Sequence, residues 1–120
     1  MLHASAVAGM AITHTGTSLP HGLSYPVTYE LKLPHGRAVG MFLGGYVETY
    51  RDKEAVREVL AMLGYTAAEE LREYLRGLLG TSGVEKELLH TSAEQLLANP
   101  AKLKNYPFPI TKEELIAMAD

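Results

Sequence analysis

The first segment of the chain, residues 2–14 (LHASAVAGMAITH), contains no Asp, Glu, Lys or Arg. Its small and apolar residues would surround a helix completely instead of forming one stripe along it, and such a helix is typically buried on all sides. A chain of 120 residues has few places for a helix of that kind. We therefore expect a helix here whose natural neighbours lie outside these 120 residues.

The remainder of the chain has helical periodicity and no alternating strand pattern of useful length. The sequence therefore predicts an all-α helical bundle that forms one domain over residues 1–120. The expected elements are a short helix after Ser18 that ends near Pro26 or Tyr29, a turn at Leu33-Pro34, and helices within 35–50, 52–63, 66–79, about 92–98 and 112–119.

Local signals indicate where several of these helices begin and end. Thr66-x-x-Glu69 and Thr111-x-x-Glu114 have the spacing of capping boxes, which open helices. Gly64 is typical of the residue that follows a helix. The run Gly80-Thr81-Ser82-Gly83 breaks the helical pattern, and a short separate segment is expected at 84–89.

The apolar residues also predict which faces point inward. Gly44-Gly45 weakens its helix by propensity and permits close packing of a neighbour. Apolar side chains at helical spacing are expected to face the core at Val39, Phe42, Leu43 and Tyr46, at Val56, Val59, Leu60 and Leu63, and at Leu71, Leu75, Leu78 and Leu79.

Composition excludes several classes of function. The chain has 11 basic and 14 acidic residues, a formal charge of −3, and no basic patch, so we expect no nucleic-acid partner. No apolar stretch approaches the roughly 18 residues that span a bilayer, so we expect no membrane span. The absence of cysteine excludes disulfides and fits a reducing, cytoplasmic location. Neither a G-x-S-x-G elbow nor a G-x-G-x-x-G dinucleotide motif occurs.

Two histidines in the least charged third of the chain are the candidate metal ligands. His21 and His35 would lie roughly 21 Å apart on one continuous helix, but Pro26 and Pro34 disfavour such a helix. A helix–turn–helix would instead bring both imidazoles to one cleft. Two imidazoles suit Zn, Fe, Ni or Cu, and a stable site needs three or four ligands. Histidines in such a segment also commonly serve packing or capping, so the residues alone leave both roles open.

The run AGMAITHTGTSLPHGLSYPVTYELKLPHGRAVG, residues 8–40, resembles the metal-ligand region of the iron-containing alcohol dehydrogenases. In that family a helix of small residues leads through a glycine-containing turn to a histidine, and Pro-His-Gly follows 14 residues later. Here these are His21 and Pro34-His35-Gly36. The tail NPAKLKNYPFPITKEELIAMAD, residues 99–120, also resembles the end of that family.

The resemblance implies a two-part enzyme, with a nucleotide-binding α/β half followed by a helical half of the dehydroquinate synthase-like kind. In the family, one aspartate and three histidines bind a divalent metal between the halves. The resemblance implies iron, and the ligand chemistry also permits zinc. The first two ligands belong to an Asp-x-x-x-His motif that these 120 residues lack. The resemblance assigns the other two to His21 and His35, and it implies that NAD(P) binds in the half that is missing here.

One position departs from the family pattern. Many members have a second histidine four residues after the one that matches His21, near the nicotinamide, and this chain has Tyr25 there. A phenol can still donate or relay a proton. Tyr25 is therefore a candidate for a role beside the ligands or in a proton path.

The expected function is thus a C-terminal metal-binding helical fragment of an iron-containing NAD(P)-dependent alcohol dehydrogenase. The complete enzyme would act on a small alcohol or aldehyde, and this chain alone would be inactive. We expect it to form a homodimer through residues 2–14. Two alternatives remain open: a non-catalytic helical interaction module, and a metal-binding module completed across a dimer.

Overall fold

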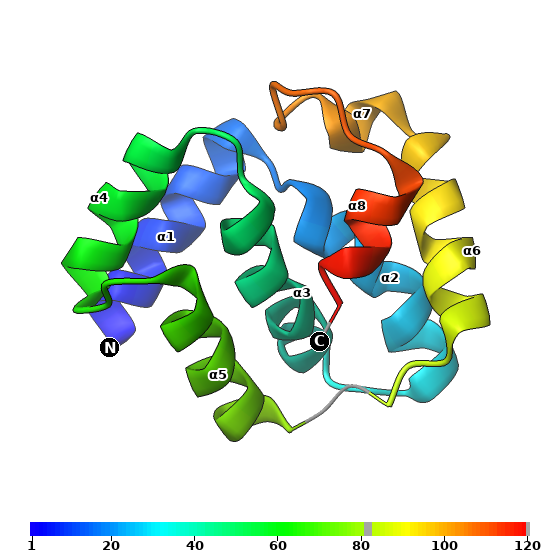
Figure 1. Ribbon diagram of the computed structural model, residues 1–120, viewed down its shortest axis with the longest axis horizontal. Helices are drawn as coiled ribbons and strands as arrows, with labels where there is room; N and C mark the ends of the chain where they lie inside the picture. Colours follow the sequence, from blue (N-terminus) through cyan, green and yellow to red (C-terminus); the bar gives the residue numbers. More distant parts are fainter. Residues whose placement is uncertain (81–82, 120) are drawn as a thin grey trace.

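A computed structural model describes residues 1–80 and 83–119 and contains helices without strands in that part of the chain (Figure 1). The all-α fold class is confirmed. The break expected at residues 80–83 includes Thr81 and Ser82, which lie outside the described residues. The helices are α1 (Leu2–Thr15), α2 (Leu19–Leu31), α3 (His35–Thr49), α4 (Lys53–Leu63), α5 (Ala68–Leu79), α6 (Lys86–Leu97), α7 (Pro100–Leu103) and α8 (Lys112–Ala117).

The core lies where α2, α3, α6 and α8 meet. α2 packs against α3 and α6, and α6 also packs against α8. Removing their apolar side chains from water supplies the main stabilisation of this arrangement. The buried side chains of the core are Leu19, Leu23, Val27, Ala38, Phe42, Leu89, Ala93, Leu96, Tyr106, Leu115 and Met118.

Helix α2 continues through Pro26 to Leu31, so the prediction that it ends near Pro26 or Tyr29 was wrong. A proline inside a helix removes one backbone hydrogen bond. However, Leu19, Leu23 and Val27 recur at four-residue intervals on one face and are fully or almost fully buried. Their packing stabilises the helix across the proline.

The double glycine of α3 allows the close packing that the sequence predicts. An ideal Cβ on Gly44 would lie 3.0 Å from the backbone and side chain of Arg72 on α5. A Cβ on Gly45 would lie 2.4 Å from the carbonyl oxygen of Met118, which follows α8. α3 therefore touches the backbones of two neighbours at adjacent positions.

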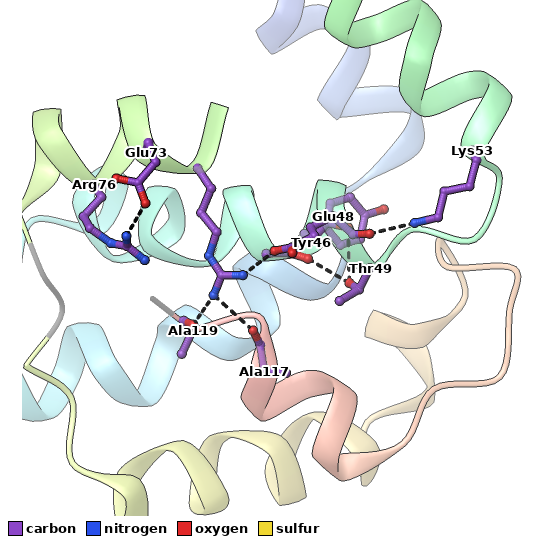
Figure 2. A network of polar contacts seen from close by, with 10 residues as sticks. Tyr46, Glu48, Thr49, Lys53, Glu73, Arg76, Ala117 and Ala119 are labelled. Atoms are coloured by element: carbon purple, nitrogen blue, oxygen red, sulfur yellow. Dashed lines mark hydrogen bonds and ion pairs between the residues drawn. The ribbon is translucent and has the colours of Figure 1, made fainter. Parts of the chain in front are cut away.

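Polar contacts strengthen the same junction (Figure 2). The guanidinium of Arg72 forms an ion pair with Glu48 of α3. It also donates a hydrogen bond of 2.8 Å to the carbonyl oxygen of Ala119 and a longer one to Ala117. In Figure 2, Glu48 approaches from α3, and Ala117 and Ala119 approach from the end of α8. These contacts join α3, α5 and the chain segment after α8.

Most helix ends agree with the sequence, with two corrections. Gly64 follows α4 in the left-handed region, and the Thr111 hydroxyl accepts a hydrogen bond from the amide of Glu114 at α8. At α5, however, Glu70 rather than Glu69 accepts the hydrogen bonds from the residues before the helix. The segments expected at 84–89 and 92–98 form one helix, α6, because apolar residues on one face of both segments pack against the core.

Several side chains that were predicted to face inward are exposed. Leu60 and Leu71 are buried as expected, but the outer turns of α4 and α5 face solvent in this chain. The exposed apolar side chains from the predicted inner faces are Leu43, Val59, Leu63 and Leu78. Helical periodicity identified the apolar face of each helix, but it did not indicate how much of that face neighbouring helices would bury.

Helix α1 forms where the sequence predicts it, yet none of its residues is buried. In Figure 1, α1 and α4 lie at one edge of the molecule, outside the group of α2, α3, α6 and α8. The other helices of this chain therefore do not bury residues 2–14, although the sequence predicts a buried helix there.

Candidate metal centre

The first helix of the site places three polar side chains on one face. His21, Tyr25 and Thr28 stand at positions i, i+4 and i+7 of α2, a spacing that aligns side chains along a helix. Lys32 follows α2 with φ of 53°, and α3 then begins directly after Pro34. This reversal brings His35, the first residue of α3, over the polar face of α2.

The imidazole rings of His21 and His35 lie side by side, with their centroids 5.5 Å apart and their planes at 64°. Metal–nitrogen bonds of imidazole measure about 2.1 Å, so two rings that share one ion have centroids about 5 Å apart. The observed pair fits that requirement. A continuous helix would have separated the two rings by much more, so the turn at Pro34 creates the pair.

Tyr25 and Thr28 hold the ring of His35. The phenol ring of Tyr25 lies parallel to the imidazole, with an interplanar angle of 2° and centroids 5.7 Å apart. The hydroxyl of Thr28 lies 3.5 Å from Nδ1 of His35, at the long limit of a hydrogen bond. Contacts on Nδ1 leave Nε2 available as a ligand.

A lysine from a distant part of the chain also reaches this site. Nζ of Lys102, on α7, donates hydrogen bonds to the hydroxyl of Tyr25 at 3.1 Å and to Oγ1 of Thr17 at 3.5 Å. The ammonium also lies 5.0 Å from the centroid of the Tyr25 ring. Tyr25 thus contacts His35 with its ring and Lys102 with its hydroxyl.

The environment of His21 favours the neutral form of its imidazole. Burial lowers the pKa of His21 below its ordinary value of 6.5, and the nearby charges of His35 and Lys102 lower it further. A metal binds only the neutral imidazole. The lowered pKa therefore extends the pH range in which His21 can act as a ligand.

The described residues supply two candidate ligands and no third. No group of three or more His, Asp or Glu side chains with metal-binding geometry occurs in residues 1–80 and 83–119. Two carboxylates belong to the same helices as the histidines, but Glu48 of α3 is paired with Arg72, and Glu30 of α2 lines a surface pocket with residues of α6. A complete site of three or four ligands needs groups from beyond these residues.

The chain is similar in sequence to a known protein family. The model of the Fe-containing alcohol dehydrogenase family, C-terminal, matches residues 1–119. The chain belongs to this family. The match covers the whole helical arrangement and includes both histidines. Family members use a divalent metal and NAD(P).

One curated relative is the 4-hydroxybutyrate dehydrogenase of Clostridium kluyveri, which is 26% identical over 129 aligned positions. The alignment covers 93% of this chain and 34% of that protein, so the chain spans about a third of the relative's length. No solved structure matches the chain. In residues 1–80 and 83–119, no helix is both long and apolar enough to cross a membrane.

Sequence reasoning identified three of the five polar side chains gathered here. The structure brings His21, His35 and Tyr25 together, whereas neither Thr28 nor Lys102 was assigned to this site. Thr28 could have been found from its spacing of seven residues after His21. Lys102 gave no local signal, because only the packing of α7 beside α2 brings it near the site.

Proposed function

We propose that this chain is the metal-holding helical part of an iron-type, NAD(P)-dependent alcohol dehydrogenase. The observation that carries the proposal is the pair of imidazoles, His21 and His35, with centroids 5.5 Å apart. Within a family whose members use a divalent metal, this pair has the spacing of two ligands to one ion. The ion would be Fe²⁺ or Zn²⁺, since histidine and carboxylate ligands accept both.

Each side chain of the site has a separate task in this proposal. His21 and His35 bind the metal through neutral ring nitrogens, and burial lowers the pKa of His21, which favours its neutral form. Tyr25 stacks on His35 and Thr28 contacts its Nδ1, so both orient that ring. When bound, the metal supplies a Lewis acid that stabilises negative charge on the oxygen of a small alcohol or aldehyde while hydride passes to or from NAD(P).

The remaining ligands and the nucleotide site would come from sequence beyond these 120 residues, in line with the 34% coverage of the relative. We therefore expect the chain alone to be catalytically silent. Purified chain supplied with Fe²⁺ or Zn²⁺, NAD or NADP and a range of short alcohols should reduce no nucleotide, as followed by absorbance. Turnover clearly above that of a His21→Ala variant would contradict the proposal that the site is incomplete.

The proposal also includes a cytoplasmic location, a homodimer and no nucleic-acid partner. The exposed helix α1 supports the homodimer. Leu2, Val7, Met10 and Ile12 all expose apolar side chains on this helix. Exposed apolar patches of this kind usually mark an interface. A two-fold pairing of α1 with its copy is the simplest way to cover them.

A further inference from the structure

Lys102 is a partly buried cation without a carboxylate partner among the described residues. The four ion pairs found there use other basic residues, namely Arg51, Arg72, Arg76 and Lys112. The two acceptors of the Lys102 ammonium are neutral hydroxyls, from Tyr25 and Thr17. An ammonium carries three N–H donors, so at least one remains for a ligand. Partial burial of a charge without a counter-ion costs free energy, which an anionic ligand would recover.

The position of this ammonium is fixed by its surroundings. The side-chain amide of Asn105 donates hydrogen bonds to the carbonyl oxygens of Thr15 at 2.8 Å and Thr17 at 2.9 Å. These bonds tie the loop between α1 and α2 to the segment after α7. Lys102 and its acceptor Thr17 are therefore held together rather than meeting by chance on a mobile surface.

Lys102 and its acceptor Tyr25 both line a small pocket. Its volume is about 110 Å³, and its wall includes amide side chains that can donate hydrogen bonds and apolar side chains that suit a short methylene chain. The pocket and the histidine pair share one residue, because Tyr25 lines the pocket and also stacks on His35. The lining residues are Gly22, Tyr25, Pro26, Gln95, Leu96, Asn99 and Lys102.

We propose that Lys102 binds a carboxylate of the substrate in this pocket, so that the alcohol handled at the histidine pair is a short hydroxy acid. The ammonium pairs with the carboxylate, Tyr25 and Thr17 hold the ammonium in place, and the hydroxyl end of the substrate points toward His21 and His35. This assignment rests on the proposed function, because it gives the site of that function a substrate class. Lys102 is then a specificity-determining residue.

The same ammonium could in principle attract a phosphate, and the test separates the two anions. The 120-residue chain is titrated with 4-hydroxybutyrate, with the neutral 1,4-butanediol and with inorganic phosphate, without metal. Binding is followed by NMR shifts of the Lys102 and Tyr25 signals. We expect 4-hydroxybutyrate to shift both signals saturably and the other two compounds to bind at least about fivefold more weakly. Equal binding of the diol, or tighter binding of phosphate, would overturn the assignment.

Variants test whether the binding of 4-hydroxybutyrate depends on Lys102. Lys102→Met should weaken 4-hydroxybutyrate binding about fivefold to tenfold, as expected for one partly exposed charge-assisted contact. Lys102→Arg should retain most of the affinity, and Lys104→Met, an exposed lysine two residues later, should not change it. Circular dichroism verifies that each variant is folded. Unchanged binding in folded Lys102→Met would overturn the proposal.

A separate Zn²⁺ titration of the same samples, followed at the rings of His21 and His35, keeps the two proposals distinguishable. If Zn²⁺ shifts both rings and the hydroxy acid does not bind, the assignment of Lys102 is wrong and the metal proposal stands. If the hydroxy acid binds and Zn²⁺ leaves both rings unchanged, the metal proposal is wrong, and Lys102 still forms a carboxylate site.

Discussion

Replacing Gly45 by alanine is expected to lower the free energy of unfolding by about 2 kcal/mol or more. An ideal Cβ at this position would lie 2.4 Å from the carbonyl oxygen and 2.5 Å from the Cα of Met118. Both are backbone atoms, so no side-chain rotation relieves the overlap, and α8 must move away from α3. Alanine favours the helix itself by only about 1 kcal/mol, which does not offset this cost.

Gly77→Ala is the matched control for this change. Gly77 lies inside α5, and a Cβ there would meet no atom within 4 Å. Alanine should therefore stabilise the chain by up to about 1 kcal/mol through helix propensity. Urea unfolding followed by circular dichroism measures both variants. If Gly45→Ala were as stable as Gly77→Ala, the close contact between α3 and the end of α8 would be refuted.

Met10→Lys is expected to convert a dimer of this chain into a monomer. The Met10 side chain lies near the middle of α1 and is 61% exposed. Burying an apolar patch on the order of a few hundred Å² on each copy, at about 25 cal/mol per Å², would stabilise the dimer by several kcal/mol. The entropic costs of association reduce this value. A lysine in that patch would lose the contact and bring two like charges together across a two-fold axis.

Light scattering after size exclusion, at tens of micromolar chain, measures this change. Leu78→Lys is the control, because it adds the same charge at an exposed apolar position of α5, with 65% of the residue exposed. We expect the control to leave the dimer intact. A monomeric parent chain, with Met10→Lys indistinguishable from it, would contradict the homodimer.

The fold could be predicted from the sequence as far as local signals reach. Capping residues such as Thr111, and apolar residues that recur every three or four positions, identified most helices, because both act within a few residues along the chain. Pro26 misled the prediction of α2. The tertiary packing of Leu23 and Val27 outweighs its local cost, and that packing depends in part on α6, which lies far away in sequence.

The candidate metal site could likewise be predicted where it depends on local sequence signals and could not where it depends on long-range packing. The expected turn at Leu33-Pro34 was enough to predict that His21 and His35 lie close together. The resemblance to the dehydrogenases then gave their expected role, and it pointed to Tyr25. Lys102 lies 67 residues after His35, and its proximity to Tyr25 depends on the packing of α7 beside α2, which no sequence spacing encodes.

The proposed function requires that His21 and His35 bind one metal ion together. Calorimetric titration of the chain with Zn²⁺ tests this directly, and His90→Ala, an exposed histidine of α6, is the control. We predict weak binding that each of His21→Ala and His35→Ala weakens about tenfold or more and that the double variant loses. Binding should also fade below about pH 6.5, because protons compete for the imidazoles, and the lowered pKa of His21 makes that competition weaker at this ring. Tight binding that survives in the double variant, or that His90→Ala abolishes, would show that the metal is held elsewhere.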